Sequence, residues 1–239
     1  EVPPLERVWQ RLRGAGDDLR LGDIVGHTGA FLVYLRRDES GWRGLARRSD
    51  EELLARLPGA VAEAVPELPA EPAEPWIDAP LIRAVADLAR DLGPAGAFDG
   101  ICARYVDAHS RRLLATPDNV AALMAEIAGT SGGTVLDPSC GIGTLLLASG
   151  AGLAMGQDIS ESAARLTAVR LLLRDMKAVI RAGDSLRADA FPGELADAIV
   201  CNPPFNDRGW GYEELANDPR WEYGLPPRGE SELAWVQHC

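Results

Sequence analysis

One candidate site is the segment Asn202-Pro203-Pro204-Phe205, which follows the apolar run 199–201. Neither proline can donate a backbone N–H to a sheet, so a buried strand is predicted to end here. Asn202 precedes a proline and is therefore held in an extended backbone conformation. A hydrogen-bonding amide and an aromatic ring are thus predicted at the carboxyl edge of a strand, where open α/β sheets bind ligands. Taken alone, the segment is more simply explained as a tight turn after a core strand.

A second candidate site is the glycine-rich turn after the predicted strand 134–137. Its residues are Asp137, Pro138, Ser139, Cys140, Gly141, Ile142 and Gly143, and Thr144 begins the next helix. The two glycines allow a ligand to approach the backbone, and the helix start offers free N–H groups. The turn lacks both the three-glycine dinucleotide fingerprint and the Lys-Ser/Thr pair of a P-loop. Because an acidic residue ends the strand, the turn suits a cationic or amino-acid-bearing ligand better than a pyrophosphate.

Acidic residues also mark the ends of two further predicted strands. Asp158 ends strand 153–158 and follows Asp137 by about 20 residues, the spacing at which a carboxylate holds ribose hydroxyls. Asp184 follows strand 178–182. Each Asp alone is commonly a helix cap or a turn residue. Together with the Asn202 amide, however, these carboxylates are predicted to converge on one crevice.

The elements that must position these residues alternate between strand and helix. Apolar runs predict strands at 134–137, 153–158, 178–182 and 198–201, with helices between them. This order is typical of a parallel, doubly wound α/β sheet.

A helix is predicted directly before the first strand. Thr116-Pro117 is a strong helix start, with Thr as N-cap and Pro at the first helical position, and Gly129 ends the helix. The residues expected to form its buried face are Val120, Leu123, Met124 and Ile127.

The N-terminal part of the chain is predicted to be helical. Helices are expected to begin near Leu5 and Leu21, although glycines weaken the second, and after a capping box that starts at Ser49. A stretch rich in proline and glutamate then breaks the periodicity and is predicted to be a stiff connector. The expected organisation is a helical N-terminal domain at 1–65, a linker at 66–80 and an α/β domain at 81–239.

The composition of the 239 residues narrows the class of protein. No apolar run is long enough to span a membrane and no secretory leader pattern is present, so we expect a cytoplasmic protein without membrane contact. The four cysteines and three histidines form neither a zinc pattern nor a disulfide framework, so no metal is expected. The net charge of −12 argues against a broadly basic DNA-binding face. Any nucleic-acid function must use a local basic surface, a missing segment or a partner subunit.

The turn 137–144 and the segment 202–205 together resemble the two signature motifs of adenine-N6 DNA methyltransferases. The stretch 114–120, with its Thr-Pro-x-x-Val pattern, is similar to the modification (M) subunits of type I restriction systems. The N-terminal helices and residues 232–238 are also similar to that family, the former more loosely. The resemblance implies a Rossmann-like methyltransferase sheet that uses S-adenosylmethionine (SAM), preceded by a small helical domain. It further implies seven strands, so the sheet is expected to be incomplete at residue 239.

The resemblance also implies a role for each matching residue. Those expected to hold the amino-acid part of SAM are Thr116, Pro117, Asp137, Pro138, Cys140, Gly141, Gly143 and Thr144. Asp158 would bind the ribose hydroxyls, Asp184 would lie near the adenine of SAM, and Asn202 would face the cofactor. The Asn202 side-chain oxygen and the Pro203 carbonyl would accept hydrogen bonds from the target amine. Pro204 completes this catalytic loop, and Phe205 would stack on an adenine flipped out of double-stranded DNA.

The same kind of loop also serves enzymes that methylate glutamine in proteins or guanine in RNA, and these remain alternatives, as does a SAM-binding module without catalysis. The Thr116-Pro117 stretch and the form of the turn favour DNA. In the resembled systems a separate specificity (S) subunit reads the DNA sequence and a restriction (R) subunit cuts it. We expect this chain alone to bind SAM weakly or not at all and to be inactive.

Overall fold

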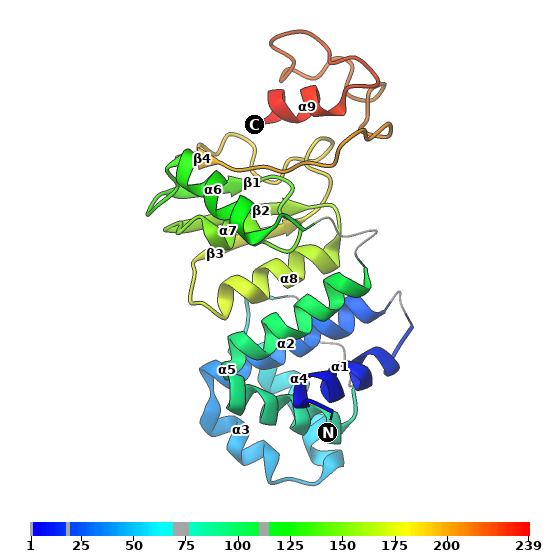
Figure 1. Ribbon diagram of the computed structural model, residues 1–239, viewed down its shortest axis with the longest axis vertical. Coiled ribbons are helices and arrows are strands. Elements are labelled where there is room, and N and C mark those ends of the chain that lie inside the picture. The colour runs from blue at the N-terminus through cyan, green and yellow to red at the C-terminus, as the bar shows by residue number, and fades with distance from the viewer. Residues whose placement is uncertain (1, 18–19, 69–76, 110–114) are drawn as a thin grey trace. The chain divides into compact units, whose positions relative to one another are not determined.

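The computed structural model describes residues 2–17, 20–68, 77–109 and 115–239 (Figure 1). The chain divides into two compact units, each of which has its own core. One unit comprises Glu1–Leu114 and Ala168–Asp175, and the other comprises Ala115–Thr167 and Met176–Cys239. Within the described ranges, no helix is both long and apolar enough to cross a membrane.

The first unit is built from helices. Their bounds are α1 Pro4–Gly14, α2 Leu21–Arg37, α3 Glu39–Ala46, α4 Asp50–Ala64 and α5 Ala79–Ala108. Helix α2 is buried over most of its length, although its glycines were expected to weaken it. A Cβ on Gly29 would lie 2.6 Å from the Phe98 ring of α5, so glycine allows these two helices to pack closely. The predicted cap of α4 is confirmed, because the Ser49 side chain accepts a hydrogen bond from the Glu52 N–H.

Helix α5 groups with the N-terminal helices. It packs against α1, α2 and α4, and it is kinked at Gly93, which has a φ of 73° and precedes Pro94. This grouping differs from the predicted limits, which placed residues 81–108 with the α/β domain. Apolar contacts of α5 with three earlier helices explain the difference. Most of the predicted linker, residues 69–76, lies outside the described residues, and its role as a linker stays a prediction.

The second unit contains a parallel sheet. Its strands are β1 Thr134–Asp137, β2 Leu153–Asp158, β3 Ala178–Ala182 and β4 Ala198–Ile199, in the spatial order β3-β2-β1-β4. The parallel pairing of the strands, and the helices that separate the first three of them along the chain, confirm the predicted α/β class. Strand β4 is shorter than the predicted 198–201. Its neighbour β1 ends at Asp137, and the Val200 N–H already bonds to the Leu136 carbonyl next to that end.

Helix α6, Asp118–Ala128, differs from the prediction in two respects. Pro117 rather than Thr116 occupies the N-cap position, and no side chain caps the helix. Small residues, Ala121 and Ala125, are buried, and α6 packs against helix α7, Thr144–Ala148.

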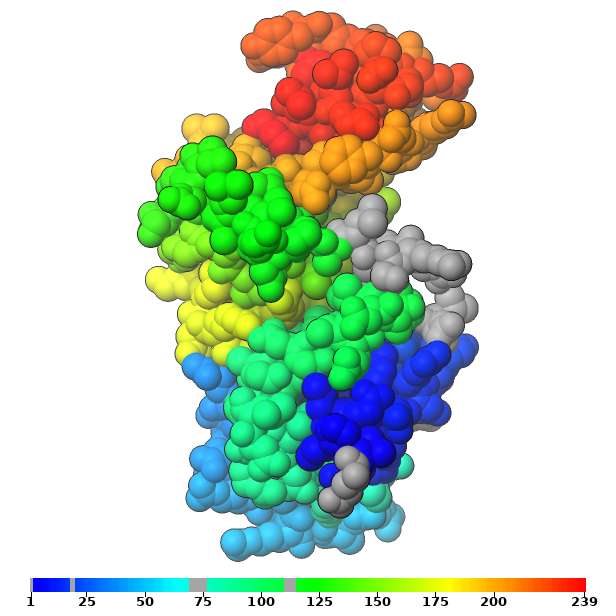
Figure 2. Space-filling model, viewed as in Figure 1, coloured from blue at the N-terminus to red at the C-terminus, as the bar shows by residue number. Residues whose placement is uncertain are grey.

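The predicted buried face of α6 was wrong for three of its four residues, while the fourth, Met124, is half-buried. Val120, Leu123 and Ile127 are 41%, 56% and 77% exposed. Periodicity identified the apolar stripe, but the alanines provide the closer approach to a neighbouring helix. Figure 2 shows this segment, in green, on the outer surface of the second unit.

Two more helices complete the second part of the sequence, α8 Glu161–Leu172 and α9 Ser231–His238. Ser160 caps α8, since its Oγ accepts a hydrogen bond from the Ala163 N–H at 3.2 Å. Between β4 and α9 the chain forms turns around an aromatic cluster.

Candidate active site

The carboxyl edge of the sheet brings the predicted site residues together. All four strands run in the same direction, so their carboxyl ends lie at one edge. Asp137 ends β1, Asp158 ends β2, Asp184 follows β3 and Asn202 follows β4. The sheet thus places three carboxylates and one amide at the edge where such folds bind ligands.

The glycine-rich turn between β1 and α7 is held in a defined shape by neighbouring residues. The Gly141 N–H donates to Asp158 Oδ2 at 2.8 Å, and the Gly141 carbonyl accepts from Thr167 Oγ1 at 2.8 Å. Gly141 and Gly143 have φ values of 54° and 81°, which residues other than glycine rarely adopt. A Cβ on Gly143 would also lie 2.8 Å from Thr167. Positive φ therefore favours glycine at both positions, and the close contact with Thr167 adds a second requirement at Gly143 alone.

The rest of the turn is anchored in the same way. The Pro138 carbonyl accepts from Ser185 Oγ at 2.6 Å, and the Cys140 N–H donates to the Gln157 carbonyl at 2.9 Å. Thr144, the first residue of α7, is 9% exposed. Burial raises the pKa of the Cys140 thiol well above its ordinary value, so this side chain stays a neutral, unreactive thiol.

Asp137 is the most perturbed carboxyl group at this edge. It is 1% exposed, and its Oδ1 accepts a hydrogen bond from the Ser139 N–H at 3.0 Å. Burial raises its pKa to about 8, and the nearby negative charge of Asp158 adds to the increase, while the Ser139 N–H opposes it. Without a cation nearby, Asp137 is thus largely protonated at neutral pH. A positively charged ligand group would favour the ionised form.

Asp158 and Asp184 make different contacts. Both Asp158 oxygens accept backbone hydrogen bonds, from Ser160 and Gly141, and burial raises its pKa despite these bonds. A carboxylate has about four lone-pair sites, so Asp158 can still accept ribose hydroxyls. Asp184 caps the following turn through its Oδ1, and its Oδ2 pairs with Arg187 at 2.6 Å. Asp184 therefore has less capacity left for a ligand.

Asn202 is exposed, and its side chain is tethered from another element. Its Nδ2 donates to Thr116 Oγ1 at 3.1 Å, across 86 residues of sequence. Thr116 was predicted to cap helix α6, but its hydroxyl instead accepts from this amide. With Nδ2 donating to Thr116, the amide oxygen Oδ1 is the atom that can accept a hydrogen bond from a ligand.

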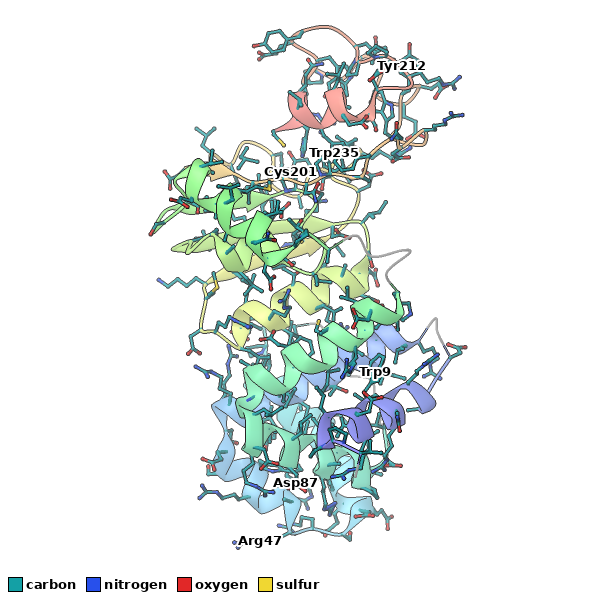
Figure 3. The ribbon with its side chains drawn as sticks, viewed as in Figure 1. Trp9, Arg47, Asp87, Cys201, Tyr212 and Trp235 are labelled. Atoms are coloured by element: carbon teal, nitrogen blue, oxygen red, sulfur yellow. The ribbon has the colours of Figure 1, made fainter. Side chains whose placement is uncertain are left out.

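The remaining residues of the loop stay close to Asn202. Pro203 and Pro204 fix the backbone, Phe205 is 62% exposed, and Pro117 follows the tethering Thr116. Cys201 lies directly before Asn202 and its Sγ is 3.3 Å from Ser139 Oγ. It also packs against the aromatic cluster that contains Trp235, as Figure 3 shows. The β1 turn and the Asn202 loop therefore touch each other.

Sequence reasoning missed several residues that hold this edge together. The buried Gln157 side chain bonds to the Ala188 carbonyl and the Ala190 N–H, each at 2.9 Å. Arg187 joins Asp184 to a later loop. A glutamine inside a predicted strand was the sequence signal that pointed to Gln157. The contacts of Arg187 depend on the tertiary fold.

Comparison with known proteins gives a consistent family. A family model described as N-6 DNA Methylase matches residues 101–239. The chain is 31% identical over 140 residues to the type I restriction enzyme MjaIX methylase subunit of Methanocaldococcus jannaschii. It is 29% identical over 156 residues to the type I restriction enzyme HindI methylase subunit of Haemophilus influenzae.

These matches cover 52% and 59% of the chain, but only 25% and 35% of the two relatives. The chain thus aligns with about a quarter to a third of their length. Among solved structures, the fold is similar to the methyltransferase subunit of a type I restriction-modification system from Streptococcus thermophilus. The TM-score is 0.64 at 18% identity, over 98% of this chain and 70% of that one.

Proposed function

The chain belongs to the N-6 DNA methylase family, and from this membership we propose that it forms part of a type I modification subunit. The proposed reaction transfers a methyl group from SAM to the N6 amine of adenine in DNA. The observation that carries the proposal is the Asn202 amide at the carboxyl edge of β4, tethered by Thr116 and adjacent to the β1 turn. The relatives above are named methylase subunits of type I restriction enzymes, which favours DNA over protein or RNA as the substrate.

The residues at the sheet edge fit SAM by the chemistry of their donors and acceptors. Asp137 lies at the start of the turn, where an ionised carboxylate would pair with the ammonium of the amino-acid part. Gly141 leaves open space, since an added Cβ there would have no atom within 4 Å. Asp158 retains acceptor capacity for ribose hydroxyls. When bound, SAM supplies a methyl group on a sulfonium sulfur that is already activated for transfer.

In this proposal the Asn202 loop prepares the adenine amine. The lone pair of an exocyclic amine is delocalised into the ring, which makes the amine a poor nucleophile. Asn202 Oδ1 and the Pro203 carbonyl would accept hydrogen bonds from the two N–H groups of the amine and stabilise positive charge that develops on nitrogen. The Thr116 tether supports this role because it directs Nδ2 away from the amine and leaves Oδ1 as the acceptor.

Phe205 would hold the target base. Its exposed ring follows the two prolines directly, so it can stack on a base placed against Asn202. The adenine must leave the duplex to reach this loop, at a cost of roughly a few kcal/mol. The protein then contributes alignment and electrostatics, and the transfer requires no covalent protein nucleophile.

DNA recognition is proposed to depend on other subunits. The net charge of −12 provides little general attraction for phosphate. A specificity subunit would read the sequence, and a restriction subunit would complete the system. On this proposal, residues 1–239 alone methylate DNA weakly or not at all.

The proposal is tested with the complete gene product and its specificity subunit expressed in a host that lacks adenine methylation. Host DNA is digested to nucleosides, and N6-methyladenine is measured by mass spectrometry. Asn202→Ala should abolish the signal. Asn217→Ala, which alters an exposed asparagine of the same unit, is the matched control and should retain it. Undiminished N6-methyladenine in Asn202→Ala would refute the role of Asn202.

A further inference from the structure

The segment after the Asn202 loop ends in a firmly packed helix. Helix α9 contributes Ala234 and Trp235 to a buried cluster with Trp210 and Leu186. Trp210 is 1% exposed, and its Nε1 donates to the Arg228 carbonyl at 3.1 Å. Tyr212 and Trp235, labelled in Figure 3, both belong to this aromatic region. Helix α9 is therefore a fixed support rather than a frayed end.

The first two residues of α9 bind the backbone directly after Phe205. Glu232 Oε1 accepts from the Asn206 N–H at 3.0 Å, and Ser231 Oγ accepts from the Asp207 N–H at 3.1 Å. The Ser231 hydroxyl also donates to Glu232 Oε2 at 3.1 Å, so the two side chains act together. Two consecutive N–H groups are thus held by one helix. Asn206 has a φ of 56°, a left-handed conformation that turns the chain at this point.

The charge state of Glu232 is suited to this contact. The Asn206 N–H lowers the pKa of Glu232, with a smaller effect from the Ser231 hydroxyl. An ionised carboxylate accepts stronger hydrogen bonds than a neutral one.

A second contact holds the chain after Phe205, this time from the turn after β3. Arg187 Nη2 donates to the Gly209 carbonyl at 2.7 Å, while Nη1 pairs with Asp184. The chain that leaves Phe205 is therefore bound both by helix α9 and by the turn after β3. The chain that leads to Phe205 is held by the Asn202–Thr116 hydrogen bond and by two prolines.

We propose that Ser231 and Glu232 are positioning residues that hold Phe205 in place to stack on the flipped base, an inference that rests on the proposed function. Phe205 is 62% exposed, so packing alone does little to fix its ring. The backbone on either side sets the position of the ring instead. A stacking surface prepared in this way spares the ordering cost when the base arrives.

The test uses the complete gene product with its specificity subunit. Glu232→Ala removes the acceptor of the Asn206 N–H, whereas Glu232→Gln keeps one oxygen that can accept it. Glu232→Ala should lower kcat/KM for DNA by roughly tenfold or more and leave KM for SAM unchanged. Glu232→Gln should restore most of the activity. Glu230→Gln, which changes an exposed acid directly before Ser231, is the matched control and should behave as wild type.

Two further readouts separate positioning from a general structural effect. Fluorescence of 2-aminopurine at the target position reports base flipping and stacking, and Glu232→Ala should alter it. In a Phe205→Ala background, Glu232→Ala should cause no additional loss, because the residue acts through the ring. Equal activity of Glu232→Gln and Glu232→Ala, additive losses in the double variant, or wild-type activity of Glu232→Ala would each overturn the proposal.

Failure of this inference differs from failure of the proposed function. If the wild-type complex methylates no adenine, the proposed function fails. Hydrogen exchange at the Asn206 amide still tests whether Glu232 holds this backbone. Glu232→Ala should accelerate the exchange several-fold relative to Glu230→Gln. Unchanged exchange would show that Glu232 does not hold this backbone.

Discussion

The buried carboxyl group of Asp137 leads to a prediction about stability and pH. Its pKa is about 8 in the folded chain and 3.8 in an unfolded one. The folded state therefore binds a proton that the unfolded state has released over this range. Between about pH 4 and pH 8, the free energy of unfolding should fall as pH rises, by at most about 1.4 kcal/mol per pH unit from this group.

The structure provides the perturbation that isolates this effect. Asp137→Asn stays uncharged at every pH and can still accept the Ser139 N–H, which bonds to Oδ1 at 3.0 Å in the wild type. The full pKa shift of Asp137 lowers the free energy of unfolding of the wild type by an amount on the order of 5 kcal/mol. Because Asp137 is 1% exposed, solvent screening reduces this value little. The variant should thus gain stability relative to the wild type as pH increases from 5 to 8.

The assay is urea unfolding of both proteins, followed by tryptophan fluorescence and circular dichroism at pH 5, 6, 7, 8 and 9. The difference between variant and wild type should grow with pH up to about 8 and then level off. SAM, if its ammonium pairs with Asp137, should bind the wild type more tightly at pH 8 than at pH 6. Parallel pH profiles of the two proteins would show that Asp137 is not protonated in the folded chain.

Three other predictions test further contacts. Thr116→Val removes the acceptor of the Asn202 amide and should lower kcat for methylation by roughly tenfold, while Thr116→Ser should restore it; equal rates for both would contradict the tether. Gly143→Ala and Gly150→Ala each introduce a side chain at positive φ, at about 1–2 kcal/mol, but only the former meets a side chain of α8 at 2.8 Å. Thermal unfolding should therefore show a larger loss of stability for Gly143→Ala, and equal losses would contradict the close contact with Thr167. Trp210→Ala should cost about 3–5 kcal/mol in urea unfolding, and a loss below about 1 kcal/mol would mean that the C-terminal cluster is not packed as described.

The sheet was predictable because its signals are local. Apolar runs that end in Asp137, Asp158 and Asn202 marked both the strands and their carboxyl ends, and the structure places these residues at one edge. Glycine at 141 and 143 likewise indicated a turn after β1, and in the structure both residues have positive φ.

Features that depend on long-range contacts were not predictable. The stripe of Val120, Leu123 and Ile127 has helical spacing, but packing through alanines leaves it exposed. Periodicity shows which residues share a helix face and does not show which face meets a neighbour. The role of Thr116 depends in the same way on Asn202, which is far away in sequence and adjacent in the fold.

The contact between Glu232 and Asn206 illustrates the same limit. Glu232 stands at a helix start, where an acidic residue is favourable for local reasons alone. Its bond to the backbone after Phe205 spans 26 residues and depends on how the aromatic cluster orients α9. Spacing in the sequence contains no signal for this arrangement.

The Asn202 loop is proposed to direct a methyl group to the N6 atom of adenine. The most direct measurement incubates the complete enzyme with DNA and SAM that carries a deuterated methyl group. Mass spectrometry of the nucleosides and of the digested protein then locates the label. We expect label in N6-methyladenine alone, and none when Asn202 is replaced by alanine. Label in methylcytosine or in a protein side chain, or label in adenine that persists in Asn202→Ala, would contradict it.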